Sequence, residues 1–486
     1  MLTECILLED LQRKFSSTKS NSRRRAMNPD YRYDAFNLMT DLSIVVRKMI
    51  DATYRCCTDS RSDKKEIPGF GIILYGSPAR YEMTNYSDID IHIIDSKPTR
   101  ESAELKSGIA NGLAAFGFGK IDDPEWRNLD IAELYAAKSI IEGNQIIDSE
   151  FVCGDTEIAK NLATLKIKYD SLEWRTKNMF FQQFYLDHYY SRRNLNTTNV
   201  KYCVGGSREL LTFDWFDKAM NYTDPNWDKG SSDLPWIKKA IDNLVYNKLI
   251  DESTYNSLYR AVNFVVLLRN EVLHANQDTA EQGYTHLDAP TLERVWKSGE
   301  VYFQSLGIER PQHISELFER ERKIVRHTKE LMLEHIIAQE KMKRGNSWGK
   351  ALDDILNPDT SYPARIELAH SEDNLLQIAS VWGAHYQGNS QLFEELAKLY
   401  SAKDNWEVLA SLACSQLCPQ EVLDEIAMRC IEQTGLGYIL RIIGRNKNTS
   451  RQTLLRIASE PRLGKRYKIV AQLNLERGID YATNRA

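Results

Sequence analysis

The sequence has no apolar run that approaches the ~20 residues needed to cross a membrane. Residues 1–15 carry acidic side chains inside a short apolar stretch and offer no small-residue cleavage site, so no secretory signal is expected. The eight cysteines show no repeated metal-ligand spacing, which argues against a zinc site. Scattered cysteines in a large chain fit a reducing compartment. We therefore expect a cytoplasmic protein without a membrane partner.

The sequence also lacks a large excess of charge of one sign. The formal net charge is −5, which gives no global case for nucleic-acid binding. Hydrophobic residues make up 42% and charged residues 27%, which is ordinary for a globular protein. A chain of 486 residues predicts about two to four domains.

One stretch, residues 69–95, has the pattern strand, turn, strand. Residues 70–75 form a short apolar run that is typical of a buried strand. Gly76 and Ser77 follow, and glycine permits the sharp backbone of a phosphate-binding turn. Residues 88–94 then alternate, which places isoleucines on one face of a second strand and Asp88, Asp90 and His92 on the other.

The alternation brings Asp88 and Asp90 to one strand face, where they are close enough to share a divalent ion. Carboxylate oxygens are the ligands that Mg²⁺ or Mn²⁺ prefers. An Asp-x-Asp triplet alone is more often a pair of solvated side chains on an edge strand. The upstream strand and Gly-Ser turn favour the metal site.

Gly-Ser followed after ten residues by Asp-x-Asp, in residues 76–90, resembles the signature of the polymerase-beta-like nucleotidyltransferase superfamily. The fuller string is similar to the bacterial PII-protein uridylyltransferases and to the minimal nucleotidyltransferases that pair with HEPN proteins. Both usually carry glycine after the arginine, where this chain has Tyr81. The resemblance implies nucleotide binding by Gly76, Ser77 and Arg80, and it implies catalysis at a metal held by the two aspartates.

A third carboxylate is expected further along the chain. Residues 128–134 predict a third strand, on which Asp130 is the candidate catalytic and metal-binding residue, with Glu133 as the alternative. An aspartate at a strand end is usually only solvated. The superfamily, however, places its third carboxylate on the strand after the helix that we expect over residues 101–116.

A second segment, residues 199–215, resembles the uridylyltransferase sequence Asn-x-Lys followed by Gly-Gly-x-Arg-Asp-Leu and an aromatic residue. Two glycines between a lysine and an arginine let the backbone approach an anion while two cations neutralise it. The resemblance implies a nucleotide-binding role for Lys201, Gly205, Gly206 and Arg208. The alternative is a glycine-led helix start with surface cations.

A third segment, residues 268–274, is similar to the uridylyltransferase run Leu-Arg-Asn-x-Leu-His, with one extra residue before the histidine. The same residues also resemble the Arg-Asn-x-x-x-His motif of HEPN ribonucleases. Arg269 and His274, about one helical turn apart, would then act as phosphate clamp and general acid on RNA. More often such a pair caps or bridges neighbouring helices.

The end of the sequence carries a repeat. Leu396-Ala397, Ile426-Ala427 and Ile457-Ala458 recur at intervals of 30 and 31 residues, each within a leucine-rich helical pattern. This period is typical of stacked helix pairs, and the units resemble leucine-rich-variant or HEAT-like repeats.

The sequence therefore predicts an α+β protein with a small mixed sheet, a helical domain and an α-solenoid-like repeat array. The expected parts are a flexible basic arm (1–30), a nucleotidyltransferase domain (31–150), a helical substrate or nucleotide domain (151–344), a linker (345–365) and helical repeats (366–486).

The uridylyltransferases also carry a metal hydrolase domain with a His-Asp pair, and this sequence contains no His-Asp dipeptide. The expected activity is therefore transfer of a nucleoside monophosphate from a nucleoside triphosphate to a protein acceptor, as in UMPylation or AMPylation, with the repeats engaging the acceptor. The alternatives are an RNA-acting enzyme, by nucleotide addition or HEPN-type cleavage, and a binding protein with a silent transferase fold.

Overall fold

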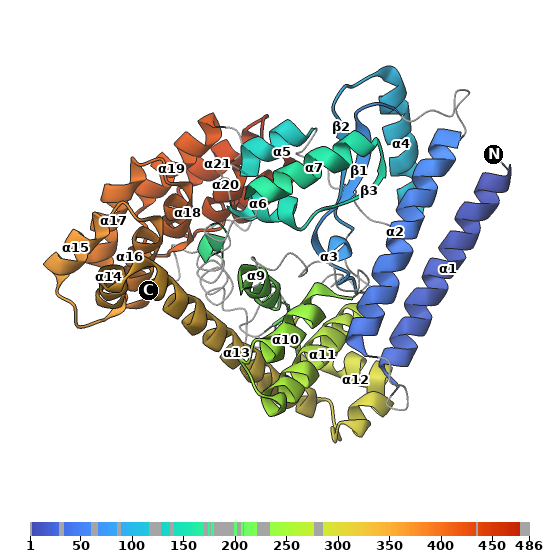
Figure 1. Ribbon diagram of the computed structural model, residues 1–486, viewed down its shortest axis with the longest axis horizontal. Coiled ribbons are helices and arrows are strands. Elements are labelled where there is room, and N and C mark those ends of the chain that lie inside the picture. Colours follow the sequence, from blue (N-terminus) through green and yellow to red (C-terminus); the bar gives the residue numbers. More distant parts are fainter. Residues whose placement is uncertain are drawn as a thin grey trace. The chain divides into compact units, whose positions relative to one another are not determined.

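The computed structural model describes residues 2–28, 34–59, 67–84, 89–115, 128–136, 140–169, 174, 176–178, 199–201, 206–207, 209–220, 234–276, 285–433 and 436–476. These residues are mostly helical and include one small sheet, so the α+β class is confirmed (Figure 1). The chain divides into two compact units. The first comprises Met1–Ala132, Gln145–Arg175 and Tyr190–Met332, and the second comprises Glu133–Asn144, Thr176–Tyr189 and Leu333–Ala486.

The first unit holds the sheet and the helices that precede and follow it. Its strands are β1 (Phe70–Leu74), β2 (Ile91–Asp95) and β3 (Glu150–Gly154). Its helices are α1 (Leu2–Ala26), α2 (Ala35–Asp59), α3 (Gly76–Ala79), α4 (Arg100–Ala115), α7 (Thr156–Tyr169), α9 (Leu211–Met220), α10 (Trp236–Tyr246), α11 (Glu252–Ala275) and α12 (Ala289–Ser305). Three helices contribute residues to both units: α5 (Leu129–Ala136), α6 (Ile140–Ile147) and α13 (Gln312–Arg344).

The sheet has the strand order β2-β1-β3, and both pairings are antiparallel rather than mixed as predicted. Leu74 lies opposite Ile91 on one side and Glu150 on the other. The two predicted strands are therefore present as neighbours, but β2 begins at Ile91 and not at residue 88, so Asp90 precedes the strand and does not lie on its face as predicted. Strand β3 begins at Glu150 and continues past the domain boundary that the sequence predicted between residues 150 and 151.

The third strand predicted over residues 128–134 is wrong, because this segment belongs to helix α5. Leu129, Ala132 and Ala136 are buried at three- and four-residue spacing, which is the period of a helix. The Asn128 side chain accepts a hydrogen bond from the Ile131 amide at 2.9 Å and so caps the first turn. The short segment therefore satisfies its backbone locally and does not need a neighbouring strand.

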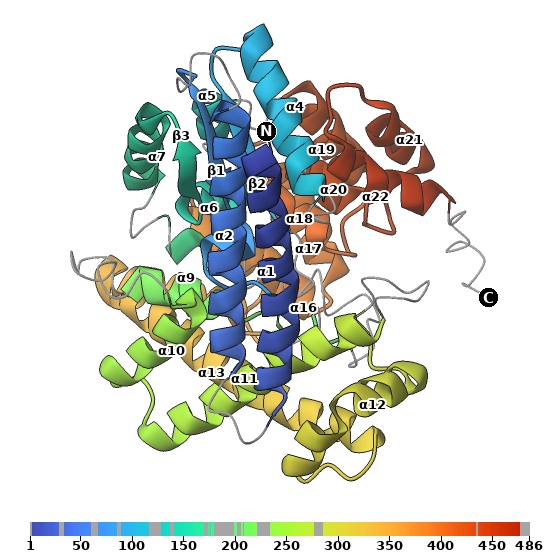
Figure 2. The same cartoon turned by 90° about the vertical axis from the view of Figure 1, so that its right-hand side faces the viewer.

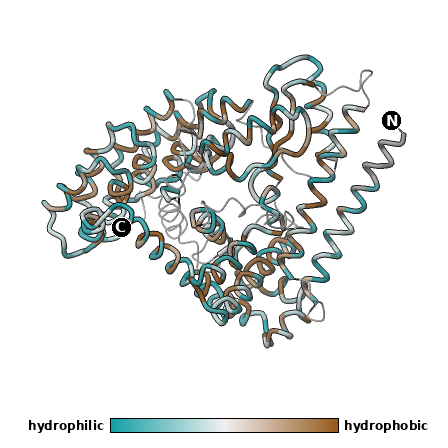
Figure 3. The backbone as a smooth tube through the Cα atoms, in the orientation of Figure 1, coloured by the Kyte–Doolittle hydropathy of each residue, from teal (hydrophilic) through white to brown (hydrophobic). Residues whose placement is uncertain are grey.

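Helices α2 and α7 cover opposite faces of the sheet. Tyr54 of α2 stacks on Phe70 at 6.4 Å between ring centroids. A Cβ atom on the next residue, Gly71, would lie 3.0 Å from the Ile158 side chain of α7. Because successive residues of a strand face opposite ways, the strands are buried from both sides. Figure 3 shows hydrophobic segments along the length of α2.

Residues 2–26 form helix α1 and not the predicted flexible arm. The helix runs beside α2 in both Figure 1 and Figure 2. Arg23 donates to the Glu271 carboxylate of α11, with Nε 2.8 Å from Oε1, and Ser298 donates to the same carboxylate. A basic, polar segment is thus ordered by an ion pair with a residue about 250 positions away, which local composition does not reveal.

Arg23→Ala should lower the free energy of unfolding by about 2 to 4 kcal/mol, because it leaves a buried carboxylate without its charged partner. The Glu271 side chain is 1% exposed and that of Arg23 is 22% exposed, so the loss should fall below that of a fully buried pair. Denaturant titration of the purified chain measures it. Lys14→Ala, which removes an exposed ion pair from the same helix, is the control and should have no measurable effect. Equal effects of the two substitutions would show that the Glu271 pair does not hold α1.

The second unit contains an array of short helices. They are α14 (Asn346–Leu356), α15 (Tyr362–Ala369), α16 (Asn374–Tyr386), α17 (Ser390–Ser401), α18 (Trp406–Cys414), α19 (Gln420–Glu432), α20 (Gly437–Ile443), α21 (Arg451–Ser459) and α22 (Lys465–Glu476). Helices α16, α18, α20 and α22 contact one another in succession, and α15, α17, α19 and α21 form a second row. Leu396, Ile426 and Ile457, the residues of the sequence repeat, are buried in α17, α19 and α21.

The predicted linker over residues 345–365 is wrong, because most of it is helical. Gly345, with φ of +89°, separates α13 from α14, and Trp348, Leu352 and Ile355 of α14 are buried. Gly345, Pro358 and Pro363 lie next to or at helix ends, where they break or begin helices, whereas Gly349 is buried within α14. Within the described ranges, no helix is both long and apolar enough to span a bilayer.

Candidate functional site

The end of β1 brings together two residues that the sequence assigned to one site. The Tyr75 amide donates to the Asp90 carbonyl at 3.1 Å and closes the β1–β2 hairpin. Gly76 follows with φ of +67°, and a Cβ atom at this position would lie 2.5 Å from Oδ2 of Asp90. The backbone of the turn therefore lies directly against the Asp90 carboxylate, and only glycine fits there.

The turn that follows Gly76 is held by its own hydrogen bonds and by α2. The Glu82 amide donates to the Ser77 carbonyl at 2.8 Å. Tyr81 adopts φ of +57°, a left-handed conformation that a glycine at this position would adopt more easily. Arg47 of α2 lies 4.0 Å above the Tyr81 ring and donates to the carbonyls of Pro78 and Ala79. Contacts from α2 thus offset the conformational cost of a tyrosine at this position.

Arg80, predicted to bind nucleotide, lies in the interior. Its guanidinium is 2.8 Å from the Glu82 carboxylate and 3.1 Å from that of Asp148. Burial opposes its charge, but Glu82 and Asp148 outweigh burial and raise the pKa of Arg80. The side chain therefore holds the turn from the interior through Glu82 and Asp148, and its contact with a nucleotide stays a prediction.

A buried group of charges that the sequence patterns did not predict extends from Arg80. Lys218 of α9 lies 2.8 Å from Asp148 and 2.9 Å from Asp214, with its ammonium 3.7 Å above the Trp236 ring. Asp214 and Lys218 stand four residues apart, which on a helix places them on one face. This spacing was visible in the sequence, but the pair is indistinguishable there from an ordinary surface ion pair.

Asp88, Gly205 and Arg208 lie outside the described residues, so their predicted roles stay predictions. Lys201 is described, and its amide donates to the Asn199 side chain at 3.0 Å. The neighbouring segment is joined to residues 285–286, through the amide of Val200 and a bridge from Asn199 to His286. Gly206 is buried.

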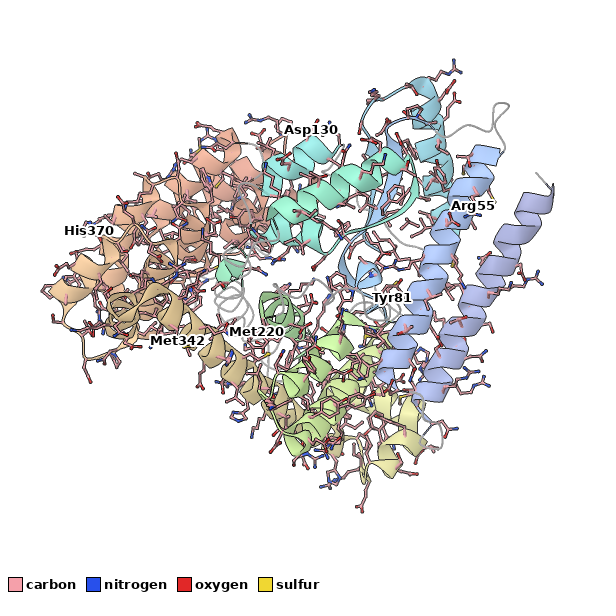
Figure 4. The ribbon with its side chains drawn as sticks, viewed as in Figure 1. Arg55, Tyr81, Asp130, Met220, Met342 and His370 are labelled. Carbon is pink, nitrogen blue, oxygen red and sulfur yellow. The ribbon has the colours of Figure 1, made fainter. Side chains whose placement is uncertain are left out.

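Asp130 lies in the first turn of α5, where a carboxylate is favoured by the helix dipole, and its side chain is exposed. We call residues 76–82 the Gly76 turn. Figure 4 shows Asp130 on a different part of the chain from Tyr81, which lies near the end of this turn. Glu133 lies on the same helix. Among the described residues, no group of three His, Cys, Asp or Glu side chains is arranged to hold a metal ion.

Arg269 and His274 both lie on α11, with half-buried side chains. Five positions along a helix correspond to a rotation of about 140°, so the two side chains leave the helix on different sides. The residues between them include Asn270 and Glu271, which are buried and joined to each other and to α1. This segment therefore contributes to the core of the first unit.

Comparison with known proteins adds no family assignment. A scan against protein-family models found no match to this chain, and a search of curated proteins found none either.

Proposed function

We propose that the chain is a metal-dependent nucleotidyltransferase that moves a nucleoside monophosphate from a nucleoside triphosphate to a protein acceptor. The observation that supports this proposal most strongly is the contact between Gly76 and Asp90. A glycine with positive φ, lying against a carboxylate at the end of a strand hairpin, matches the arrangement implied by the sequence signature.

The residues around Gly76 include a carboxylate that would bind a divalent ion. The Asp90 carboxylate lies against the backbone of Gly76, which has no side chain that would keep an ion away. Asp88 is two residues away in sequence, and a carboxylate pair would hold Mg²⁺ or Mn²⁺. When bound, such an ion neutralises charge on the triphosphate.

The chain's own residues would do the rest by positioning. The backbone N–H groups of Gly76 and Ser77 would bind the phosphates beside the Asp90 carboxylate, which lies against Gly76. Lys201 and Arg208, from the segment over residues 199–215, would supply positive charge to the triphosphate. Most of the rate enhancement would come from orientation and charge neutralisation.

The helical array of the second unit would engage the protein acceptor. Successive helices contact their neighbours in two rows, as in solenoid proteins, which present extended surfaces to other proteins. The acceptor would supply the hydroxyl-bearing side chain that receives the nucleoside monophosphate.

The test is incubation of the full chain with each of the four labelled ribonucleoside triphosphates, Mg²⁺ and cell lysate. Label on a protein band is expected, and it should disappear when EDTA removes the metal. Label on RNA would show instead that the chain adds nucleotides to RNA. Cleaved RNA without label would point to Arg269 and His274, and no label on either would contradict the transferase proposal.

A further inference from the structure

Five charged side chains form a buried group behind the Gly76 turn. They are Arg80, Glu82, Asp148, Asp214 and Lys218, all within the first unit, and we call them the charge cluster. None of the five side chains is more than 10% exposed. They come from three separate parts of the sequence, so the cluster forms only when these parts are folded together.

A continuous set of contacts connects Lys218 to the turn. Its ammonium donates to Asp148 at 2.8 Å, and the other oxygen of Asp148 accepts from Arg80 at 3.1 Å. The Arg80 amide in turn donates to the Gly76 carbonyl at 3.2 Å. A displacement of Lys218 would therefore be transmitted to Gly76 through two intervening residues.

Helix α10 holds the same turn from its other end. The Trp236 amide donates to the Arg80 carbonyl, and the Ile237 amide donates to the Glu82 carboxylate, both at 3.1 Å. Lys218 also lies over the Trp236 ring. The end of the turn thus packs against α9 and α10, and Lys218 of α9 also contacts Trp236 of α10.

Among the residues that the structure describes, the charges in the cluster do not balance. Two cations, Arg80 and Lys218, face three carboxyl groups, so full ionisation leaves one negative charge in excess in a buried site. An uncompensated buried charge is costly, and one bound proton removes it. Burial raises the pKa of Asp214 to about 7, whereas Lys218 and Arg80 outweigh burial and lower the pKa of Asp148.

The charged groups facing Asp214 come from several elements. They are Lys218 on the same helix, Asp148 after α6, and Glu82 and Arg80 after α3, while Lys166 of α7 acts on Asp148. On the α10 side, Asn243 donates to Asp217 at 2.8 Å. The Asp214 carboxylate accepts from Lys218, whereas Glu82 and Asp148 each accept from two groups. Asp214 is therefore the member of the cluster at which a proton relieves the excess charge with least disturbance to other pairs.

We propose that Lys218 is a positioning residue for the Gly76 turn and that Asp214 makes this positioning depend on proton binding. The expected effect on nucleotide affinity rests on the proposed function, whereas the expected effect on the turn does not. With Asp214 protonated, the Lys218 ammonium pairs with the Asp148 carboxylate alone. Asp148 then holds Arg80, and Arg80 holds the turn in place. When Asp214 releases its proton to solvent, two carboxylates share one ammonium, and the excess negative charge opposes a bound triphosphate.

The first arm of the test measures stability against pH. The pKa of Asp214 is raised on folding, so its contribution is fully present at low pH and is lost as pH rises through about 7. Between about pH 5 and about pH 8, the wild type should therefore lose more stability than Asp214→Asn, which mimics the protonated acid. Asp242→Asn, which removes the i,i+4 partner of Lys238 on α10, is the matched control and should behave like the wild type. Identical pH dependence in wild type and Asp214→Asn would overturn the proposal.

The second arm reads the turn directly by hydrogen exchange. In Lys218→Met, exchange at the amides of Arg80 and Glu82 should accelerate by about tenfold or more, and Lys218→Arg should restore protection. Unchanged exchange in the methionine variant would overturn the positioning role. If that variant does not fold, Asp214→Asn still decides the proposal, because it retains every other charge of the cluster.

The third arm measures equilibrium binding of ATP and UTP with Mg²⁺ to the same variants. Affinity in the wild type should fall as pH rises through about 7, and the fall should be absent in Asp214→Asn. A fall of equal size in both proteins would overturn the proposal. If exchange responds to Lys218→Met but even the wild type binds no triphosphate, the positioning role is supported and the proposed function is contradicted.

Discussion

Asp90→Asn should reduce nucleotidyl transfer at least tenfold while leaving the fold intact. The substitution keeps the size of the side chain but removes the charge that a divalent ion requires, next to the backbone of Gly76. A tenfold loss corresponds to ~1.4 kcal/mol of transition-state stabilisation. The measurement is the initial rate of acceptor labelling at saturating triphosphate, compared with the wild type. Asp88→Asn should give the same result.

Asp95→Asn is the matched control for this experiment. Asp95 ends the same strand, and its carboxylate accepts a hydrogen bond from Ser102 at 2.6 Å. It should retain the wild-type rate, because it lies five residues along from the proposed metal ligand. If Asp90→Asn keeps more than about a tenth of the wild-type rate, the metal assignment is wrong.

Gly76→Ala should both destabilise the protein and abolish transfer. The positive φ of +67° costs an alanine about 1 to 2 kcal/mol. The added Cβ would also lie 2.5 Å from Oδ2 of Asp90, so the carboxylate must move or the turn must open, at a further cost of about 1 to 3 kcal/mol. Denaturant titration measures the stability change, and acceptor labelling measures the loss of transfer.

Gly307→Ala separates the two contributions. Gly307 has φ of +77°, and a Cβ atom there would meet nothing within 4 Å. It should show the conformational cost alone and keep full activity. Equal destabilisation by the two alanines would mean that the Asp90 carboxylate does not lie against Gly76.

The sequence by itself determined the local elements of the hairpin. The apolar run and the alternation that follows predicted β1 and β2, and the structure pairs them in register. Gly76 comes just after β1, and Asp90 comes just before β2. The two residues lie at the same end of one hairpin, so they come together by a contact that is local in the sequence. The repeat period of 30 and 31 residues likewise places Leu396, Ile426 and Ile457 at equivalent buried positions, because neighbouring helix pairs repeat the same local contacts.

Where contacts between distant segments decide the outcome, the tertiary structure departed from the sequence patterns. Helix α1 is held to α11 by Arg23 and Glu271, a pair that no local window of sequence can show. The third strand is residues 150–154 and not 128–134, because a segment capped by Asn128 completes its own hydrogen bonds as a helix.

Arg80 shows most clearly what the sequence does not determine. From its place after a phosphate-binding turn it was assigned to nucleotide, yet it points inward to Glu82 and Asp148. Its direction depends on Asp148, Lys218 and Trp236, which lie far along the chain and surround it only after folding. Short-range patterns specify strands, turns and helices because their hydrogen bonds close locally. The partner of a buried charge depends on which distant segments exclude water from it, and that is decided only by the tertiary structure.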